Sequence, residues 1–365
     1  MNKLPFYQKF SLNLVSVVIL SITIYYGQDM LVPLLFAILL ATLLLPVTNF
    51  LAKKRFPRTL SILLPIFLSI TLGGAILYFL SSQILNFTDD LPAIQERMND
   101  VGLSIQRWIK ENTHMTIWKQ NLYIQQTLDN LKEKAPQLAS QTIGSLTGII
   151  TYITLLPIYT FLILYYRSVI KAFLVSTFKN GSEDNVKEIL TESTTISQHY
   201  MIGQLFETIL VFALNTVGFL ILGIKYAIFL ALVAAILNLI PYVGLVIANI
   251  LCMFITLINS EMISDVVWVG VILAIVQFID NNIGMPLLVG SKVKINGLVT
   301  IIGILVGGEL CGVSGMFLSI PALAVAKVIC DRVNGLESWG KLLGDGSDHV
   351  PVEKRAIAVD RKSVV

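Results

Sequence analysis

Long apolar runs separated by short polar segments dominate the first quarter of the chain. Residues 11–26 and 31–51 form two such runs on either side of Gly27-Gln28-Asp29, and a third run covers residues 59–85. Each run approaches or exceeds the roughly 20 apolar residues with which an α-helix crosses a bilayer. We therefore expect N-terminal membrane spans in residues 1–85, with a turn at Gly27–Asp29.

The next segment, residues 86–141, has a different pattern. It is polar, and its apolar side chains recur at spacings of three and four, which is typical of amphipathic helices. A break near Asn112-Thr113-His114 divides it into two helices. We expect an extracytoplasmic helical hairpin whose apolar stripes pack against each other or against the same insert of a neighbouring subunit. A partner-binding surface on this hairpin is the alternative.

Basic residues set the expected orientation of the spans. The densest basic cluster lies in residues 53–58, and Arg167 and Lys171 follow a fourth apolar span at 142–166. Because loops rich in Lys and Arg stay in the cytoplasm, we expect the N-terminus to be cytoplasmic. Residues 167–200 are then a cytoplasmic helical connection.

The region 201–333 is expected to be the transport core, since it contains two apolar runs with breaks. In order, it has a span at 201–222, a run at 228–257 broken at Pro241–Gly244, a span at 266–282, and a run at 298–325 broken at Gly307–Gly315. Each half of a broken run is too short to cross a bilayer. We expect two re-entrant helical hairpins of opposite polarity, with kinked full spans as the alternative.

Composition supports a membrane protein over a soluble domain. Hydrophobic residues make up 55% of the chain and charged residues only 13%, with a mean hydropathy of +0.77, whereas soluble domains carry about 25% charged residues. The net charge of +3 lies beside apolar runs rather than along one helix face, so no nucleic-acid partner is expected. The polar tail, residues 334–365, is predicted to be cytoplasmic and disordered.

The predicted fold class is therefore all-α: a polytopic helical membrane protein with about six full spans, two broken or re-entrant segments and an external hairpin. Broken helices leave backbone groups unpaired, and in transporters they line the substrate cavity. The alternative is that glycines such as Gly303, Gly307, Gly308 and Gly312 only permit close helix packing.

Three carboxyl groups lie within apolar runs: Glu207, Asp280 and Glu309. A charge at the centre of a bilayer is costly, so such groups usually face a cavity or a partner. Transfer into a medium of low polarity favours the neutral form of a carboxyl group, which can then carry a proton. Asp280, within a cluster of amide side chains at Gln277–Asn282, is the first candidate for ion coupling. The alternative is that it caps a helix end.

An intramembrane enzyme is the rival class, and the sequence argues against it. The three histidines lie outside the expected spans, and no H-E-x-x-H, G-x-S-x-G or Walker A motif is present. The three cysteines show no metal-ligand spacing. We expect no catalytic residue, no metal and no cofactor.

Several short motifs resemble those of the autoinducer-2 exporter family, in order and across nearly the whole chain. They are Tyr200-Met-Ile-Gly203-Gln204, Asn238 to Gly244, Gln277 with Asp280-Asn281, Pro286 to Gly290, and Gly307-Gly308 through Gly312, Gly315 and Ser319-Ile-Pro321. One departure is Asp280, where the family more often has glutamate. The resemblance implies an oligomeric transporter of the bacterial inner membrane, and the family includes both exporters of the signal autoinducer-2 and sodium/proton antiporters.

We expect a secondary transporter that exports a small polar solute, such as a quorum-sensing signal, and is coupled to sodium ions or protons. Alternatives are a sodium/proton antiporter without an organic substrate and an envelope scaffold that acts through the external hairpin. Ion coupling is assigned to Asp280, Glu309 and Glu207. The expected substrate pathway comprises Gln204, Asn238, Pro241, Gly244, Gln277, Asn281, Asn282, Pro286, Gly308 and Gly312.

Overall fold

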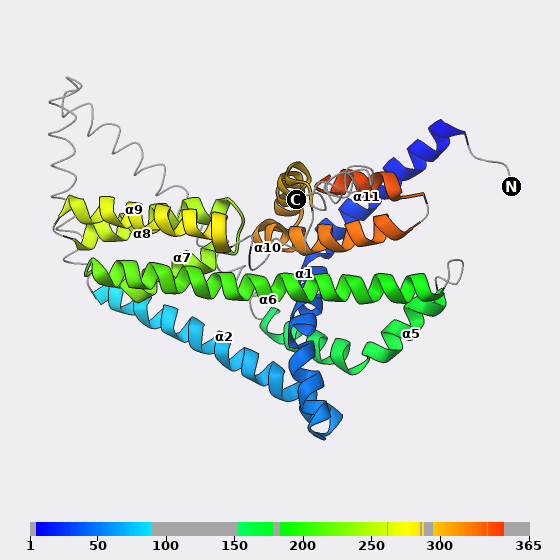
Figure 1. The fold of residues 1–365 in the computed structure, drawn as a ribbon, viewed down its shortest axis with the longest axis horizontal. Coiled ribbons are helices and arrows are strands. Elements are labelled where there is room, and N and C mark those ends of the chain that lie inside the picture. The colour runs from blue at the N-terminus through cyan, green and yellow to red at the C-terminus, as the bar shows by residue number, and fades with distance from the viewer. Residues whose placement is uncertain are drawn as a thin grey trace, which may run out of the picture.

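The computed structural model shows a helical protein (Figure 1). It describes residues 5–89, 152–177, 183–260, 262–284, 287, 295–333 and 335–346. The predicted external hairpin at 86–141 lies almost entirely outside the described residues, as does the tail beyond residue 346. Within the described parts there is no β-strand, only an isolated bridge between Ile295 and Gly344. The predicted all-α class is confirmed.

The N-terminal part is one helix, α1 (Phe6–Lys53), so the predicted turn at Gly27–Asp29 is wrong. Among the described residues, a Cβ atom at Gly27 would contact only Leu31 of the same helix, so nothing at this position requires glycine or a turn. An unbroken helix pairs its own backbone N–H and C=O groups, and lipid offers these groups no other hydrogen-bond partner. The 48 residues of α1 extend over about 72 Å at 1.5 Å per residue.

Three elements pack together near the C-terminal end of α1. These are α1 itself, α2 (Arg58–Asp89) and the helix Tyr152–Tyr165. Their shared apolar cluster consists of Ala41, Leu44, Ile62, Ile66 and Leu164. The chain then bends by 68° into α5 (Arg167–Thr177), which carries no buried residue.

The longest element of the core is α6 (Glu183–Ile221), a helix of 39 residues. The expected cytoplasmic connection and the fifth span are continuous in this helix from residue 183, where the sequence suggested a boundary at 200. One face of α6 is buried over its whole second half. That face carries Tyr200, Gly203, Gln204, Glu207, Val211, Asn215 and Phe219.

The first broken run is an antiparallel helical hairpin made of α7 (Ala227–Asn238) and α8 (Val243–Asn259). The thiol of Cys252 lies 3.7 Å from the carbonyl oxygen of Leu230, which pairs the middle of one arm with the middle of the other. At the tip, a Cβ atom on Gly244 would lie 1.7 Å from the carbonyl oxygen of Leu237. Only glycine permits this close approach of the two arms.

The second broken run, α10 (Gly297–Arg332), also folds back on itself. The turn is at Cys311 and Gly312, where Gly312 has a φ of +61°. Ser319 Oγ donates a hydrogen bond of 2.8 Å to the carbonyl oxygen of Gly303, although sixteen residues of straight helix would separate them by about 24 Å. Gly307 and Gly315 lie where the arms touch, because a Cβ atom on Gly315 would lie 1.9 Å from the Gly307 carbonyl oxygen.

The two hairpins begin at opposite ends of α6, as the opposite-polarity hypothesis predicts. Arg332, at the base of the second hairpin, pairs with Glu188 and Glu192 near the start of α6 at 2.8 and 2.6 Å. Ala227, at the base of the first hairpin, belongs to the same buried apolar cluster as Phe219 near the end of α6. Figure 1 shows α7, α8 and α9 (Ile263–Ile279) at one end of α6 and α11 (Glu337–Leu343) at the other.

The helices have the length and the surface of a multi-pass membrane protein. Five described helices are long and apolar enough to cross a bilayer, or six if the bent pair Tyr152–Tyr165 and Arg167–Thr177 forms one span. That number includes α10, which the turn at Cys311–Gly312 folds into a hairpin. Large apolar side chains are exposed along α1 and α2, for example Ile19, Leu20 and Phe67, as expected for surfaces that face lipid or other membrane helices.

The hairpin geometry predicts the labelling of its two ends in the membrane. In a cysteine-free background, single cysteines at Lys225 and Met262 should react with an impermeant maleimide from the same side. A cysteine at Val333, at the base of the second hairpin, should react from the other side. Labelling of positions 225 and 262 from opposite sides would mean that residues 227–259 cross the bilayer once.

Candidate functional site

Asp280 lies where α9 passes into a short π-helix, η1 (Asp280–Gly284). The buried face of α9 carries Val269, Leu273 and Val276 at helical spacing, and Asp280 continues that face. Its side chain is therefore directed into the protein, and the residue is only 3% exposed. π-Helical turns are rare and often occur at functional sites, so the position of Asp280 is a candidate on backbone grounds as well.

The buried face of α6 supplies a second carboxyl group. Glu207 is 4% exposed, and Gln204, one turn earlier, donates a 3.3 Å hydrogen bond from Nε2 to Glu207 Oε2. Glu207 lies fourteen residues before the end of α6, about 21 Å along the axis. Glu207 therefore lies well inside the apolar part of α6 rather than at its end.

The two carboxyl groups lie within hydrogen-bonding reach of each other. Asn238, the last residue of α7, donates a 3.3 Å hydrogen bond from Nδ2 to Asp280 Oδ2. The site therefore joins α6, the α9–η1 junction and the tip of the first hairpin. We refer to Gln204, Glu207, Asn238 and Asp280 as the carboxyl-pair site.

The close contact between the carboxyl groups of Glu207 and Asp280 requires a proton or a cation. Two ionised carboxylates offer only acceptor atoms, so a hydrogen bond between them requires a proton on one of them. No lysine or arginine in the described parts of the chain forms an ion pair with either group. Asp280 Oδ1 is buried and has no hydrogen-bond partner among the described residues. The site can therefore hold a proton between its carboxyl groups or a small cation among their oxygens.

No larger metal centre is gathered in the described residues. Among them, no three His, Cys, Asp or Glu side chains lie together as a ligand set. The carboxyl oxygens of Glu207 and Asp280 suit a hard cation such as sodium better than a soft transition metal, while Gln204 and Asn238 turn their amide N–H donors toward these oxygens.

The amide cluster expected around Asp280 does not converge on it. Gln277 donates from Nε2 to Asn281 Oδ1 at 2.9 Å, and Asn282 donates from Nδ2 to the carbonyl oxygen of Phe278 at 2.8 Å. Asn281 and Asn282 are exposed, whereas Asp280 is buried. Adjacent helical positions point in different directions, so proximity in sequence was misleading here. Pro286 lies outside the described residues.

The remaining predicted positions lie at the hairpin tips. Pro241 and Gly244 form the tip of the first hairpin, and Gly308 and Gly312 lie at the tip of the second. A Cβ atom on Gly308 would lie 2.6 Å from Met316 Cε, so this glycine serves close packing of the arms. Glu309, beside this turn, is exposed and is not part of the carboxyl-pair site.

Three residues around the site were not assigned from the sequence. Tyr200 is fully buried and close enough to Glu207 to interact electrostatically with it. Gly284 leaves room for Asp280, since a Cβ atom there would lie 2.7 Å from Asp280 Oδ1. Asn215 is 1% exposed, and its Oδ1 has no hydrogen-bond partner among the described residues. In the sequence, Asn215 could have been identified by its spacing of eleven residues from Gln204. This spacing is close to three helical turns and places both residues on one face of α6.

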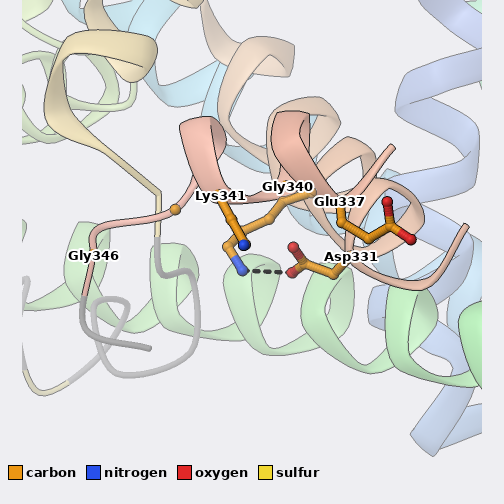
Figure 2. A pocket seen from close by; sticks show the side chains of 7 residues that line it. Asp331, Glu337, Gly340, Lys341 and Gly346 are labelled. Atoms are coloured by element: carbon orange, nitrogen blue, oxygen red, sulfur yellow. Dashed lines mark hydrogen bonds and ion pairs between the residues drawn. The ribbon is translucent and has the colours of Figure 1, made fainter. Parts of the chain in front are cut away.

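A separate cavity lies at the base of the second hairpin and is not continuous with this site. Its volume is about 360 Å³, and α10 and α11 supply its lining, including Lys327, Asp331, Glu337 and Lys341. Lys327 forms an ion pair of 2.6 Å with Asp331, and a dashed line ends at Asp331 in Figure 2. Lys327 and Asp331 pair along α10, and the lining carries two basic and two acidic side chains, so the cavity offers little excess charge to a ligand.

Comparison with known proteins agrees with a transporter. The family model described as "AI-2E family transporter" matches residues 14–335. YrrI of Bacillus subtilis (strain 168), named as a candidate transport protein, is 28% identical over 86% of this chain and 92% of its own. YhhT of Escherichia coli (strain K12), also named as a candidate transport protein, is 23% identical over 92% and 94%. The "AI-2 transport protein TqsA" of the same strain is 23% identical over 90% and 93%.

The packing of Gly284 against Asp280 predicts a specific non-additivity. Gly284→Ala should lower the free energy of unfolding in detergent by about 1–3 kcal/mol, because the added methyl group overpacks a filled space. Most of this loss should disappear in an Asp280→Ala background, where the clashing oxygen is absent. Thermal or denaturant unfolding of the four proteins in the cycle measures the coupling.

Gly297→Ala is the matched control, since nothing lies within 4 Å of a Cβ atom at that position. It should leave stability nearly unchanged. An equal loss for Gly284→Ala with and without the Asp280 carboxyl group would show that the two residues do not touch.

Proposed function

This chain belongs to the AI-2E transporter family, and from that premise we propose that it is a secondary transporter that exports a small polar solute in exchange for sodium ions or protons. The observation that supports this most strongly is the buried contact between Glu207 and Asp280. Buried carboxyl groups are costly within a membrane and are commonly retained where an ion or proton is carried. We assign the coupling role to this pair.

The pair can couple ion binding to movement of the first hairpin. Asn238 at the hairpin tip donates its hydrogen bond to Asp280. A hydrogen bond to an ionised carboxylate is roughly twice as strong as one to a neutral group. Proton or cation binding at Asp280 therefore changes how strongly the tip is held, and the hairpin responds to the state of the pair.

Polar groups along α6 provide a path between the pair and the base of the first hairpin. Gln204 and Glu207 lie in the middle of the buried face, and Asn215 follows on the same face about two turns further along. The free acceptor oxygen of Asn215 suits a hydroxyl group or a water molecule. We propose that the solute is a small polar molecule with hydroxyl groups; the relative TqsA is named as an AI-2 transport protein. Export is the direction implied by the resemblance to the autoinducer-2 exporter family.

Sodium/proton antiport without an organic substrate is a second candidate function. It is favoured by the unpartnered oxygens of Asp280 and Asn215, both of which are acceptors within the described core. Carboxyl oxygens can take up a proton and also suit a hard cation such as Na⁺. The same carboxyl pair serves either function, and flux measurements separate them.

Neutralising either member of the pair should abolish coupling. In proteoliposomes with an imposed sodium or pH gradient, Asp280→Asn and Glu207→Gln should reduce driven efflux of a labelled furanone signal to the level of protein-free liposomes. The reason is that each amide lacks the titratable proton but keeps the size of the side chain. Asp280→Glu should retain part of the flux, since the family more often has glutamate there.

Asp184→Asn serves as the control on the same α6 helix, because that carboxylate is exposed and pairs only with Lys187 among the described residues. It should transport like the wild type. Sodium movement coupled to protons, with no furanone efflux, would select the antiporter. Full coupled transport in the Asp280→Asn/Glu207→Gln double variant would refute the carrier role of the pair.

Substitution of Asn215 can distinguish a role of this residue in transport from a role in packing. Replacing it with leucine removes a buried unsatisfied oxygen, so unfolding in detergent should become harder by about 1–3 kcal/mol. If Asn215 contacts the solute or its water, the same variant should transport more slowly despite its higher stability. Lower stability with unchanged flux would instead make Asn215 a structural residue.

A further inference from the structure

Six basic side chains gather where α1 ends, α2 begins and the helix Tyr152–Tyr165 gives way to α5. They come from segments far apart in the sequence, and all six are exposed. The residues of this basic cluster are Lys53, Lys54, Arg55, Arg58, Arg167 and Lys171. Two contacts join the segments into one surface. Arg167 Nη1 donates to Asn49 Oδ1 at 2.8 Å, and Arg58 Nη2 donates to the carbonyl oxygen of Tyr165.

The cluster has no counter-charge within the described chain. None of its six members forms an ion pair there, and residues 49–58 and 165–177 contain no aspartate or glutamate. Like charges in one place repel one another. Each guanidinium has five N–H donors, and those of Arg58 and Arg167 each make one hydrogen bond among the described residues. The surface therefore has excess positive charge and unused donors.

Aromatic rings surround these charges. The Arg58 guanidinium lies 4.9 Å from the centre of the Tyr165 ring, and Lys54 Nζ lies 5.7 Å from that of Phe50. Phe50, Phe56 and Tyr166 are themselves exposed. Basic residues mixed with exposed aromatic rings at helix ends are typical of the layer where lipid headgroups meet the hydrocarbon core.

We propose that the basic cluster binds the phosphodiester headgroup of an anionic phospholipid, with Arg58 and Arg167 as the principal phosphate contacts. Arginine pairs with phosphate through two parallel N–H donors, and basic pockets between membrane helices bind anionic headgroups in this way. The exposed apolar side chains of the first turns of α2, Leu60, Leu63 and Leu64, lie beside the cluster for the acyl chains. A freely dissolved phosphate would gain nothing from these apolar residues, which favours the lipid.

The proposal is tested by titrating the full-length protein in detergent with phosphatidylglycerol and with phosphatidylcholine of equal chain length. Bound lipid is counted by native mass spectrometry, and the melting temperature is followed in parallel. Phosphatidylglycerol should bind and raise the melting temperature, and phosphatidylcholine should not. High salt should weaken binding, because exposed charges are screened. Equal retention of the two lipids would overturn the proposal.

Variants locate the site. Arg58→Gln/Arg167→Gln should weaken phosphatidylglycerol binding by about tenfold or more, since it removes two charges that attract the headgroup and both guanidinium groups that can pair with phosphate through two N–H donors. Because these arginines also tie helices together, Lys53→Gln/Lys54→Gln is measured as well. Those lysines make no side-chain hydrogen bond among the described residues, and a smaller loss of lipid binding is expected at unchanged stability.

Lys187→Gln is the matched control, since Lys187 is exposed on α6 and pairs with Glu183 and Asp184. It should bind phosphatidylglycerol like the wild type. Unchanged binding in both cluster variants would place the lipid elsewhere and refute the proposal. Displacement of the lipid by inorganic phosphate at equal concentration would show a free-anion site instead, which also refutes it.

Discussion

The need to pair every backbone polar group inside an apolar environment governs this structure. In lipid, an α-helix meets that need within a single segment, and an open break leaves N–H and C=O groups unpaired. The chain follows the rule in α1 and α6, which remain helical through glycine and polar residues. It departs from the rule at the tips of two hairpins, at Pro241–Gly244 and at Cys311–Gly312.

Glycine makes those departures possible. Gly244 lies against the Leu237 carbonyl group, and Gly307 lies against Gly315. At each contact a methyl group would occupy the position of a backbone atom, so side chains there would force the arms apart. The sequence interpretation treated close packing and a substrate pathway as alternatives. In the structure, close packing forms the hairpins, and the first hairpin then carries Asn238 to the buried carboxyl pair.

The carboxyl pair depends on this scaffold for its neighbours. Glu207 and Asp280 belong to different helices, and their contact requires the buried faces of α6 and α9 to pack together. The basic cluster, by contrast, lies on exposed helix ends and depends on three helices meeting there. The carboxyl-pair site buries two acidic groups that have few polar partners. The basic cluster exposes its positive charges where lipid headgroups can neutralise them. Both follow from the cost of an unpaired charge near lipid.

The sequence by itself determined the helical membrane class, the two broken segments and the position of Glu207, Asp280 and Glu309 within apolar runs. These depend on hydropathy and on glycine and proline spacing, which are local properties. It could not show that α1 runs unbroken through Gly27, because glycine is compatible with a turn as well as with a helix. Nor could it pair Glu207 with Asp280 or turn Asn281 and Asn282 away from them. Those outcomes depend on which faces of α6 and α9 meet, and that is decided by packing between segments distant in sequence.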